Sequence, residues 1–300
     1  MDNLDALKKD LETTKSLQSI ISTMKSIAAV NIKKYENVVF NTNKYRSNVD
    51  MGVQAILGQY PNIIDYIKYI ENKTENDFTK KRDIVIIIGS NQGLCGRFND
   101  KVSEFYLENS TNDKNEYIIT VGDRIGMLLT AQHIKFDKHF STPNSINAII
   151  KLVYELFNII EAFLKKNMLR KVVIYYTTYS SGDAGNLIKS KILPLDRKYF
   201  RKLNSKKWPT NNIPFWRTDI KVLMSDLVQQ YIFTNIYLTI VNSMAAEQKN
   251  RLMTLQGTEE NIREHIIENN LKYNQMRQNI ITSELIDVVG GSRFLKKRRR

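Results

Sequence analysis

The apolar residues in the last quarter of the chain follow a single helical repeat. Residues 223–292 contain no proline, and core positions recur there at alternating steps of three and four residues. These positions are Leu238, Val241, Ala245, Gln248, Leu252, Leu255, Glu259, Ile262, Ile266, Asn269, Tyr273, Met276 and Ile280. A stripe that repeats about every 3.5 residues is typical of a left-handed coiled coil. Because a helix rises about 1.5 Å per residue, the segment predicts a shaft of roughly 100 Å, too long for a globule of this mass to enclose.

The first sixty residues predict a partner for this helix. No proline interrupts residues 2–60, and Pro61 supplies the first stop signal. Apolar residues recur at Leu4, Leu7 and Leu11 and then, after one slip of register, at Leu17, Ile20, Met24 and Ile27. We expect the two terminal helices to form an antiparallel pair. The alternative is two independent surface helices of a bundle, although such helices rarely exceed about 25 residues without caps.

Strand and helix patterns alternate between Pro61 and Pro214. β-branched runs predict strands at 83–88, 117–121 and 172–176, and the segments between them predict helices at 100–108, 124–132 and 144–166, the last starting from Ser141-Thr142-Pro143. This alternation favours a mostly parallel, Rossmann-like sheet. A fourth strand near 189–195 would lie at an edge, because Pro194 has no N–H to donate to a neighbouring strand.

The chain therefore predicts an α/β fold in which a long antiparallel coiled coil of N- and C-terminal helices carries an inserted Rossmann-like α/β domain. The expected segments are a shaft helix at 1–60, a foot domain at 61–215, and a shaft helix with a basic tail at 216–300. Apolar residues make up 42% of the chain, and none of their runs approaches the roughly 18 residues of a membrane span. The first residues lack the features of a signal peptide, and the single cysteine, Cys95, fits a reducing cytoplasm.

The net charge of +14 points to an acidic partner. Nucleic acid is one candidate, since lysine and arginine neutralise phosphates. However, the basic residues are spread along the chain, and no nucleic-acid-binding motif accompanies their one dense cluster of Arg293, Lys296, Lys297, Arg298, Arg299 and Arg300. An acidic protein sleeve around a basic shaft explains the charge equally well. We favour protein partners and expect no nucleic acid.

The glycine-rich turn at 89–99 does not match a nucleotide-binding motif. Gly89 and Gly93 are four residues apart, whereas a dinucleotide fingerprint needs its first two glycines two apart. Gly96-Arg97-Phe98 also lacks the lysine that ends a P-loop. We expect these glycines to permit a tight turn and close packing of helix on sheet, and we expect no cofactor.

Catalytic and metal-binding patterns are missing from the sequence as well. The histidines are scattered, at His133, His139 and His265, and no cysteine cluster accompanies them. Cys95 has no adjacent histidine to activate it, which favours a structural cysteine. Three aspartates fall near strand ends, where loop carboxylates are common: Asp83, Asp123 and Asp183. We therefore expect no catalytic residue.

Three blocks of sequence carry a family resemblance. The first is the segment 14–29, which contains Met24 in Ser-Thr-Met-Lys-Ser-Ile-Ala-Ala. The second comprises Gly93, Leu94, Cys95, Gly96, Phe98 and Asn99. The third, and strongest, comprises Ser243 to Glu247, Arg251, Asn261, Tyr273-Asn274, Arg277-Gln278, Ile281-Thr282, Glu284-Leu285 and Val289. Together these blocks resemble the γ subunit of F-type ATP synthases, the central rotor shaft.

The resemblance implies a non-catalytic subunit whose helix pair turns inside a ring of α and β subunits while the β subunits hydrolyse or make ATP. One apolar stripe would both hold the helices together and face this sleeve. The residues implied are ring contacts at Met24, Arg251, Gln278 and Thr282 and a foot turn at Gly93, Leu94, Cys95 and Gly96. Further implied partners are an ε-like subunit and, where present, a membrane rotor ring, at the cytoplasmic side of a bacterial membrane.

Two segments depart from the family's pattern. One precedes the C-terminal helix and corresponds to the foot that faces the membrane rotor ring in the family, and the other is the C-terminal tail. Where the family shows a Tyr-x-x-Glu-Pro-like stretch, this chain reads Pro214-Phe215-Trp216-Arg217, and its tail is basic rather than small and apolar. In the turn, Asn91-Gln92 and Arg97 replace the family's residues. These departures leave open the shaft of an F-type-like ATPase that drives something other than a proton ring. A basic coiled-coil scaffold that binds nucleic acid and a Rossmann enzyme with helical extensions are the remaining alternatives.

Overall fold

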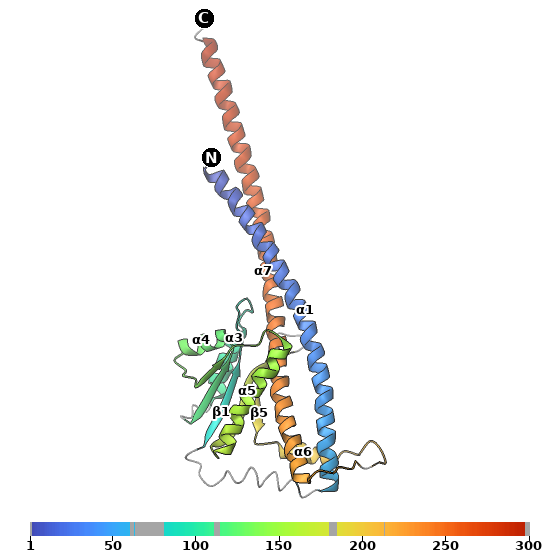
Figure 1. Ribbon diagram of the computed structural model, residues 1–300. Helices are drawn as coiled ribbons and strands as arrows, with labels where there is room; N and C mark the ends of the chain where they lie inside the picture. The colour runs from blue at the N-terminus through green and yellow to red at the C-terminus, as the bar shows by residue number, and fades with distance from the viewer. Residues whose placement is uncertain are drawn as a thin grey trace. The chain divides into compact units, whose positions relative to one another are not determined.

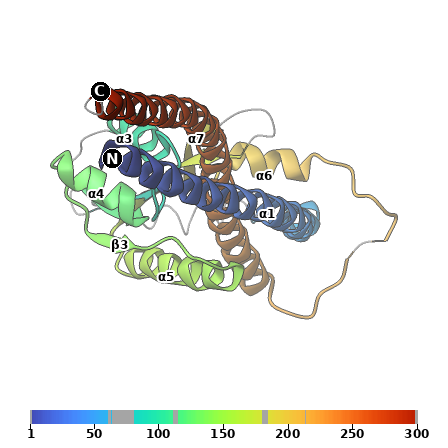
Figure 2. The same cartoon turned by 90° about the horizontal axis from the view of Figure 1, so that it is seen from above.

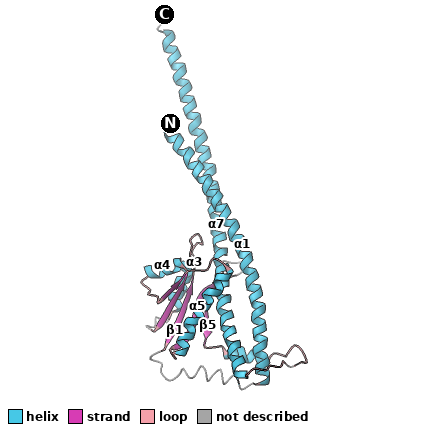
Figure 3. Ribbon diagram, in the orientation of Figure 1, coloured by secondary structure: helices cyan, strands magenta, loops and turns pink. Residues whose placement is uncertain are grey.

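The computed structural model describes residues 2–60, 63, 81–110, 115–179, 185–212 and 214–297 of the chain. In chain order its elements are α1 (Asp2–Gln59), β1 (Arg82–Ile88), α3 (Phe98–Asn109), β2 (Glu116–Val121), α4 (Asp123–Ala131), β3 (Lys138–Phe140), α5 (Ile146–Lys165), β4 (Leu169–Thr178), β5 (Asn186–Leu193), α6 (Arg197–Asn204) and α7 (Ile220–Lys297) (Figure 3). Both predicted terminal helices are present.

The chain divides into two compact units. Unit 1 joins Met1–Ala28 to Leu252–Arg300, and unit 2 is Ala29–Arg251. The division cuts through both α1 and α7, whereas the boundaries predicted from sequence, after residues 60 and 215, fall close to the ends of these helices. Each unit therefore contains a part of both terminal helices.

Unit 2 holds a sheet with the order β3-β2-β1-β4-β5 (Figure 1). β1 pairs in parallel with β2 and β4, and β2 pairs in parallel with β3. β5 pairs antiparallel with β4 and lies at the edge of the sheet, as predicted, but it ends at Leu193, directly before Pro194, and not at residue 195. The sequence reading missed β3, because Lys138–Phe140 is too short and too polar to give a strand pattern.

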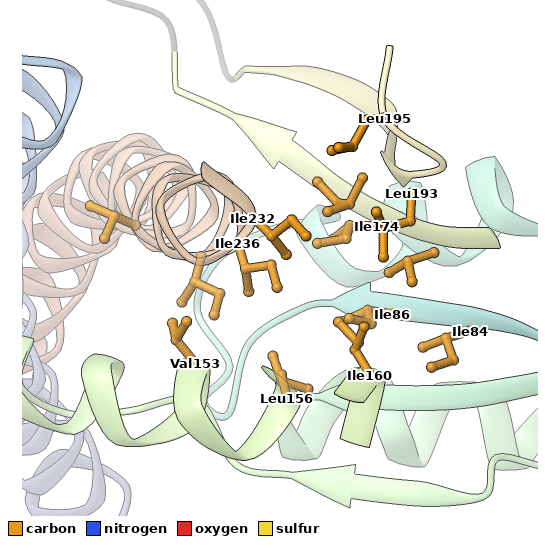
Figure 4. Close-up of a cluster of buried hydrophobic side chains, with 14 of the residues drawn as sticks. Ile84, Ile86, Val153, Leu156, Ile160, Ile174, Leu193, Leu195, Ile232 and Ile236 are labelled. Atoms are coloured by element: carbon orange, nitrogen blue, oxygen red, sulfur yellow. The ribbon is translucent and has the colours of Figure 1, made fainter. Parts of the chain in front are cut away.

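Helices cover both faces of this sheet because β1 alternates its side chains between them. Val85 and Ile87 pack with α3 and α4. Ile84 and Ile86 pack on the opposite face with α5 and with the parts of α1 and α7 in unit 2 (Figure 4). The continuous apolar run predicted a strand buried on both faces, and this prediction is confirmed. Each fully buried isoleucine contributes roughly 1.5–3 kcal/mol to the stability of the fold.

Two helix predictions need correction. α5 begins at Ile146 with Ser145 as its N-cap, whose side chain accepts from the Ala148 N–H, rather than at the predicted Ser141-Thr142-Pro143. α6 was not predicted, because its eight residues are fewer than a helical period needs to be recognised. Its apolar side chains, Phe200 and Leu203, are buried in the core of unit 2.

In unit 1 the two helices run antiparallel, and the predicted register of α7 is confirmed. The seam positions Leu255, Glu259, Ile262, Ile266, Asn269, Tyr273, Met276 and Ile280 are all buried or half-buried. Two polar links cross the seam. Lys25 forms an ion pair with Glu259, and the Asn269 amide donates to Asp10 Oδ2 at 2.8 Å.

The predicted register slip in α1 is wrong. The side chains of Leu17, Ile20 and Ile27 are 48, 55 and 55% exposed. The residues of α1 that face the seam instead follow one unbroken heptad register. They are all buried or half-buried: Leu4, Leu7, Leu11, Thr14, Gln18, Ile21, Lys25 and Ala28. The sequence reading followed the apolar residues, whereas the seam accepts polar residues where a partner across it satisfies them, as Glu259 does for Lys25.

Candidate partner-contact surfaces

The turn between β1 and α3 is docked on α7. Cys95 and Phe98 are both buried and pack against Ala246 of α7. The Arg251 guanidinium reaches the same turn, where Nη2 donates to the Gly93 carbonyl at 3.4 Å. We predicted that this turn belongs to the foot, near the start of α7. The contacts instead place the turn beside the middle of α7, away from the helix start at Ile220.

Arg251 forms a buried ion pair with Glu247 one helical turn earlier. Each residue is only 6% exposed, and Arg251 Nη2 lies 2.7 Å from Glu247 Oε1. Burial raises the pKa of the Glu247 carboxyl, and the charge and hydrogen bond of Arg251 partly offset this shift. Within the chain, Arg251 therefore joins α7 to the turn. Its predicted contact with a ring subunit stays a prediction, and little of the side chain is exposed to make it.

The turn is held from inside by a small polar network. Asn99 Oδ1 accepts from the backbone N–H of buried Ser90 at 2.9 Å, and Asn99 Nδ2 donates to Ser90 Oγ at 2.9 Å. Leu94 and Gly96 have φ of 60° and 58°, in the left-handed region that favours glycine. Burial raises the pKa of the Cys95 thiol, which fits a structural cysteine rather than a nucleophile.

A second polar network ties together the loops at the carboxyl edge of the sheet. Asp123 Oδ1 accepts from Ser141 Oγ at 2.8 Å and lies 3.0 Å from His139 Nε2. The Ser141 hydrogen bond is the first cause that lowers the pKa of Asp123, followed by His139. Since Ser141 donates to the carboxylate and not to the imidazole, this set is not arranged to activate a serine.

The remaining aspartates that we considered have other surroundings. Fully buried Asp83 lies at the amino end of β1, where Arg170 binds both its oxygens at 2.6 and 2.7 Å and Lys171 lies 2.8 Å away. Asp183 lies outside the described residues. Among the residues that the structure describes, no group of three or more His, Cys, Asp or Glu is placed to hold a metal ion.

An exposed apolar stripe lies on α1 in unit 1. It consists of Leu17, Ile20 and Ile27, with half-buried Met24 at the position between them. Their spacing of three, four and three residues places them on one helix face. A contiguous exposed stripe of this kind marks a surface for a partner. The stripe that was expected both to join the helices and to face a sleeve is therefore two stripes: a buried one that joins the helices and an exposed apolar one on another face of α1.

α7 carries a similar surface near its C-terminal end. Gln278 and Thr282 are exposed, and the Thr282 hydroxyl donates to the Gln278 carbonyl at 2.8 Å. Ile281 and Leu285 are exposed beside them, as is Val288. From the sequence we named Ile281 and Leu285 only as part of the family resemblance and did not name Val288, because we followed the seam to Ile280 and these three residues lie off the steps of the seam.

The fold and these surfaces define a class of protein, in which a pair of long terminal helices carries an inserted, mostly parallel sheet. A family model described as ATP synthase matches residues 3–295, and the chain belongs to this family, as a γ-type subunit, the non-catalytic central rotor stalk. No helix among the described residues is both long and apolar enough to cross a membrane.

Relatives and solved structures agree with this family. The chain is 26% identical over 304 residues to the ATP synthase gamma chain of Fusobacterium nucleatum, covering 98% of this chain and 100% of the relative. It is 25% identical over 293 residues to that of Mycoplasma mycoides, covering 97% and 99%. A chain from the Euglena gracilis mitochondrial ATP synthase OSCP/F1/c-ring structure matches with a TM-score of 0.62 at 14% identity, covering 100% of this chain and 96% of that one.

Proposed function

We propose that the helix pair of unit 1 turns inside a ring of α and β subunits and carries torque between this ring and a membrane-side rotor. The observation that carries the proposal is the exposed apolar stripe of Leu17, Ile20 and Ile27 on a helix pair with a seam of its own. A smooth apolar surface suits a bearing, because dispersion and burial favour contact without fixing one angle. The solved Euglena rotor and F1/c-ring structures support the assignment.

In this proposal the predicted ring contacts fall into two groups. Met24 borders the α1 stripe, and Gln278 and Thr282 lie on the exposed surface of α7. These positions support contacts of all three residues with loops of the ring. Arg251 acts instead through the turn at Gly93, by fixing the inserted domain to α7. ATP is hydrolysed or made on the β subunits, and an ε-like subunit completes the shaft, at the cytoplasmic side of the membrane.

The test uses the chain co-expressed with the α and β subunits of its own organism. The double variant Ile20→Asp/Ile27→Asp places two charges on the stripe, and Ser16→Asp/Ser19→Asp places two charges at exposed polar positions of the same helix. We expect the first variant to keep the melting temperature of the free chain but to lose assembly with the ring. The second should assemble normally. Normal assembly and ATPase activity of the stripe variant would refute the proposal.

A second candidate differs in what the shaft drives. Its motivation is the segment Pro214-Phe215-Trp216-Arg217, which lacks the carboxylate–proline pair expected of a foot on a proton ring. Native purification of the tagged complex followed by mass spectrometry distinguishes the two candidates. A firmly bound proteolipid ring would establish an ion-coupled rotor, and an α/β ring with other companions would favour this second candidate.

A further inference from the structure

The helix α6 is connected to the rest of unit 2 by loops at both of its ends. Residues 194–196 separate it from β5, and the described residues between it and α7, 205–212 and 214–219, contain no helix or strand. Among them, Phe215 is 87% exposed. The segment after α6 runs outward before it returns to the start of α7 (Figure 2). Loops of this kind are compliant, so the backbone alone does not fix the orientation of α6 relative to α1 and α7.

Apolar packing holds α6 on one side. Phe200 and Leu203 are buried in the core of unit 2. Next to this packing lies a cavity of about 370 Å³, whose lining includes Tyr199 of α6, Asn43 of α1 and Asn235 of α7. Close-packed side chains resist movement only where their atoms interlock, and the cavity lacks such contact. The orientation of α6 therefore depends on directional contacts beside the cavity.

Two hydrogen bonds tie the segment after α6 to the last turns of α1. Gln54 Nε2 donates to the Lys206 carbonyl at 2.7 Å, and Gln59 Nε2 donates to the Pro214 carbonyl at 3.0 Å. Both bonds end on backbone atoms of the loop and not on α6 itself. Of the α6 side chains that the structure describes, Tyr199 alone makes a hydrogen bond or ring contact with α1.

The ring of Tyr199 takes part in a contact of three helices. The guanidinium of Arg46 in α1 lies 5.7 Å from the ring centroid of Tyr199 and 5.7 Å from that of Tyr231 in α7. The two rings lie 5.7 Å from each other, and all three side chains are half-buried. A cation over an aromatic face is attracted by the ring quadrupole, and the attraction grows as water is removed. Arg46 therefore joins α1, α6 and α7 at one point.

The hydroxyl of Tyr199 is bound to α1 as well. It donates to Asp50 Oδ2 at 2.5 Å, and Asp50 lies one helical turn after Arg46 on the same face of α1. Asp50 Oδ1 is buried and has no hydrogen-bond partner within the described part of the chain, so this carboxylate depends on the Tyr199 hydroxyl. Burial, followed by the hydrogen bond and charge of Asp50, raises the pKa of Tyr199, which keeps the hydroxyl protonated as a donor. A hydrogen bond to a charged acceptor is directional and roughly twice as strong as a neutral one.

We propose that Tyr199 is a positioning residue that fixes α6, and with it the foot at 205–219, to the two shaft helices. Arg46 and Tyr231 hold its ring and Asp50 holds its hydroxyl, so a rotation of α6 against α1 disturbs the ring contact and the hydrogen bond together. Torque that enters at the foot then turns the shaft before it turns α6. The purpose of this restraint rests on the proposed function, whereas the restraint itself is a property of the free chain and is tested there first.

The first experiment measures how far α6 moves against α1 in the full chain. Spin labels are attached at Lys202→Cys on α6 and Asn37→Cys on α1, both exposed positions, while the native Cys95 is only 2% exposed. Residue 37 lies about 20 Å along α1 from Asp50, a separation that suits pulsed EPR. Tyr199→Phe keeps the ring and removes the hydroxyl, and it should broaden the distribution of label distances about 1.5-fold or more. An unchanged width would overturn the inference.

A matched tyrosine separates positioning from general stability. Tyr175 of β4 is buried on the sheet face that packs with α3 and α4, and its hydroxyl donates to the Asn109 carbonyl at 3.1 Å. Tyr175→Phe should lower the melting temperature by about 2–4 °C and leave the distance distribution unchanged. Arg46→Met should broaden the distribution, and Arg46→Lys, which keeps a cation over the rings, should recover part of the loss. Equal broadening by the two tyrosine variants, or none by Arg46→Met, would overturn the inference.

The second experiment follows rotation of the chain assembled with its α and β subunits. A bead is attached at Asn211→Cys in the foot or at Asn37→Cys on α1, and its angular fluctuation is recorded while the shaft pauses. Tyr199→Phe should increase the fluctuation about twofold for the foot and leave it unchanged for α1. Equal fluctuation of parent and variant at the foot would overturn the inference. A parent that assembles and hydrolyses ATP without rotating would refute the proposed function instead, because the distance distributions test the restraint separately.

Discussion

Replacing Arg251 separates its two suggested roles, as a contact of the ring and as a link inside the chain. Arg251→Ala removes the partner of Glu247 and leaves a carboxylate that is 6% exposed without its cation. Breaking a buried ion pair on one side costs about 3–5 kcal/mol, because the remaining charge must stay desolvated. The double variant Glu247→Leu/Arg251→Met removes both charges and should lie within about 1 kcal/mol of the parent.

Urea unfolding of the full chain, followed by tryptophan fluorescence, measures these differences in unit 2, where both tryptophans lie. With a slope of about 2–3 kcal/mol per molar urea, Arg251→Ala should lower the midpoint by about 1–2 M. The pH dependence provides a second readout. Burial already raises the pKa of Glu247, so its contribution to stability falls as pH rises through that pKa, and without Arg251 the fall becomes larger. Lowering the pH from about 7.5 to about 5 should therefore recover part of the loss, relative to the parent.

The reasoning would be refuted by a loss of less than about 1 kcal/mol in Arg251→Ala, or by a double variant no more stable than the single one. Assembly with α and β subunits then distinguishes the two roles. A stable double variant that assembles and couples ATP hydrolysis to rotation would show that no ring contact at Arg251 is required, since this variant also lacks the hydrogen bond to Gly93. A stable double variant that fails to couple supports the ring contact predicted from the sequence.

Further substitutions test the seam of unit 1 and the turn that follows β2. Met276→Asp or Ile280→Asp places a charge in the seam of unit 1, which should cost about 2 kcal/mol. Protease cleavage of the paired helices should therefore increase by about tenfold or more. Asn274→Asp, at an exposed position, should leave the cleavage rate unchanged. Gly122→Ala should destabilise unit 2 by more than about 2 kcal/mol in thermal unfolding, because its φ is 119° and an added Cβ would lie 2.9 Å from the backbone of Ser90.

Regular patterns in the sequence were enough to predict most of the fold. The α7 register was correct because its steps alternate without interruption from Leu238 to Ile280. β3 and α6 were missed because short elements carry too few residues to show a period. The slip in α1 was wrong because Thr14 and Gln18 look like surface residues in isolation, and only the position of α7 shows that they face the seam.

The candidate site was less accessible to sequence reasoning. The turn at Gly93 and the helix position Arg251 were predicted separately, as parts of different surfaces, and the fold brings them into contact. Nothing in the spacing of residues 93 and 251 indicates this contact, because it depends on how the sheet lies against α7. Exposure is likewise a property of the folded chain, so Phe215 could be seen as unusual only in the structure.

The polar links across the seam of unit 1 fix the register of the two helices. A slide of one heptad would bring Lys25 opposite Leu252 or Ile266 in place of Glu259, and an unpaired ammonium would meet a hydrocarbon side chain. A purely apolar seam would lack this penalty, since one leucine position is much like the next. Under load, slippage of one helix along the other would be the easiest way for such a pair to yield. The ion pair of Lys25 with Glu259 opposes this movement, so the two helices resist sliding along their length.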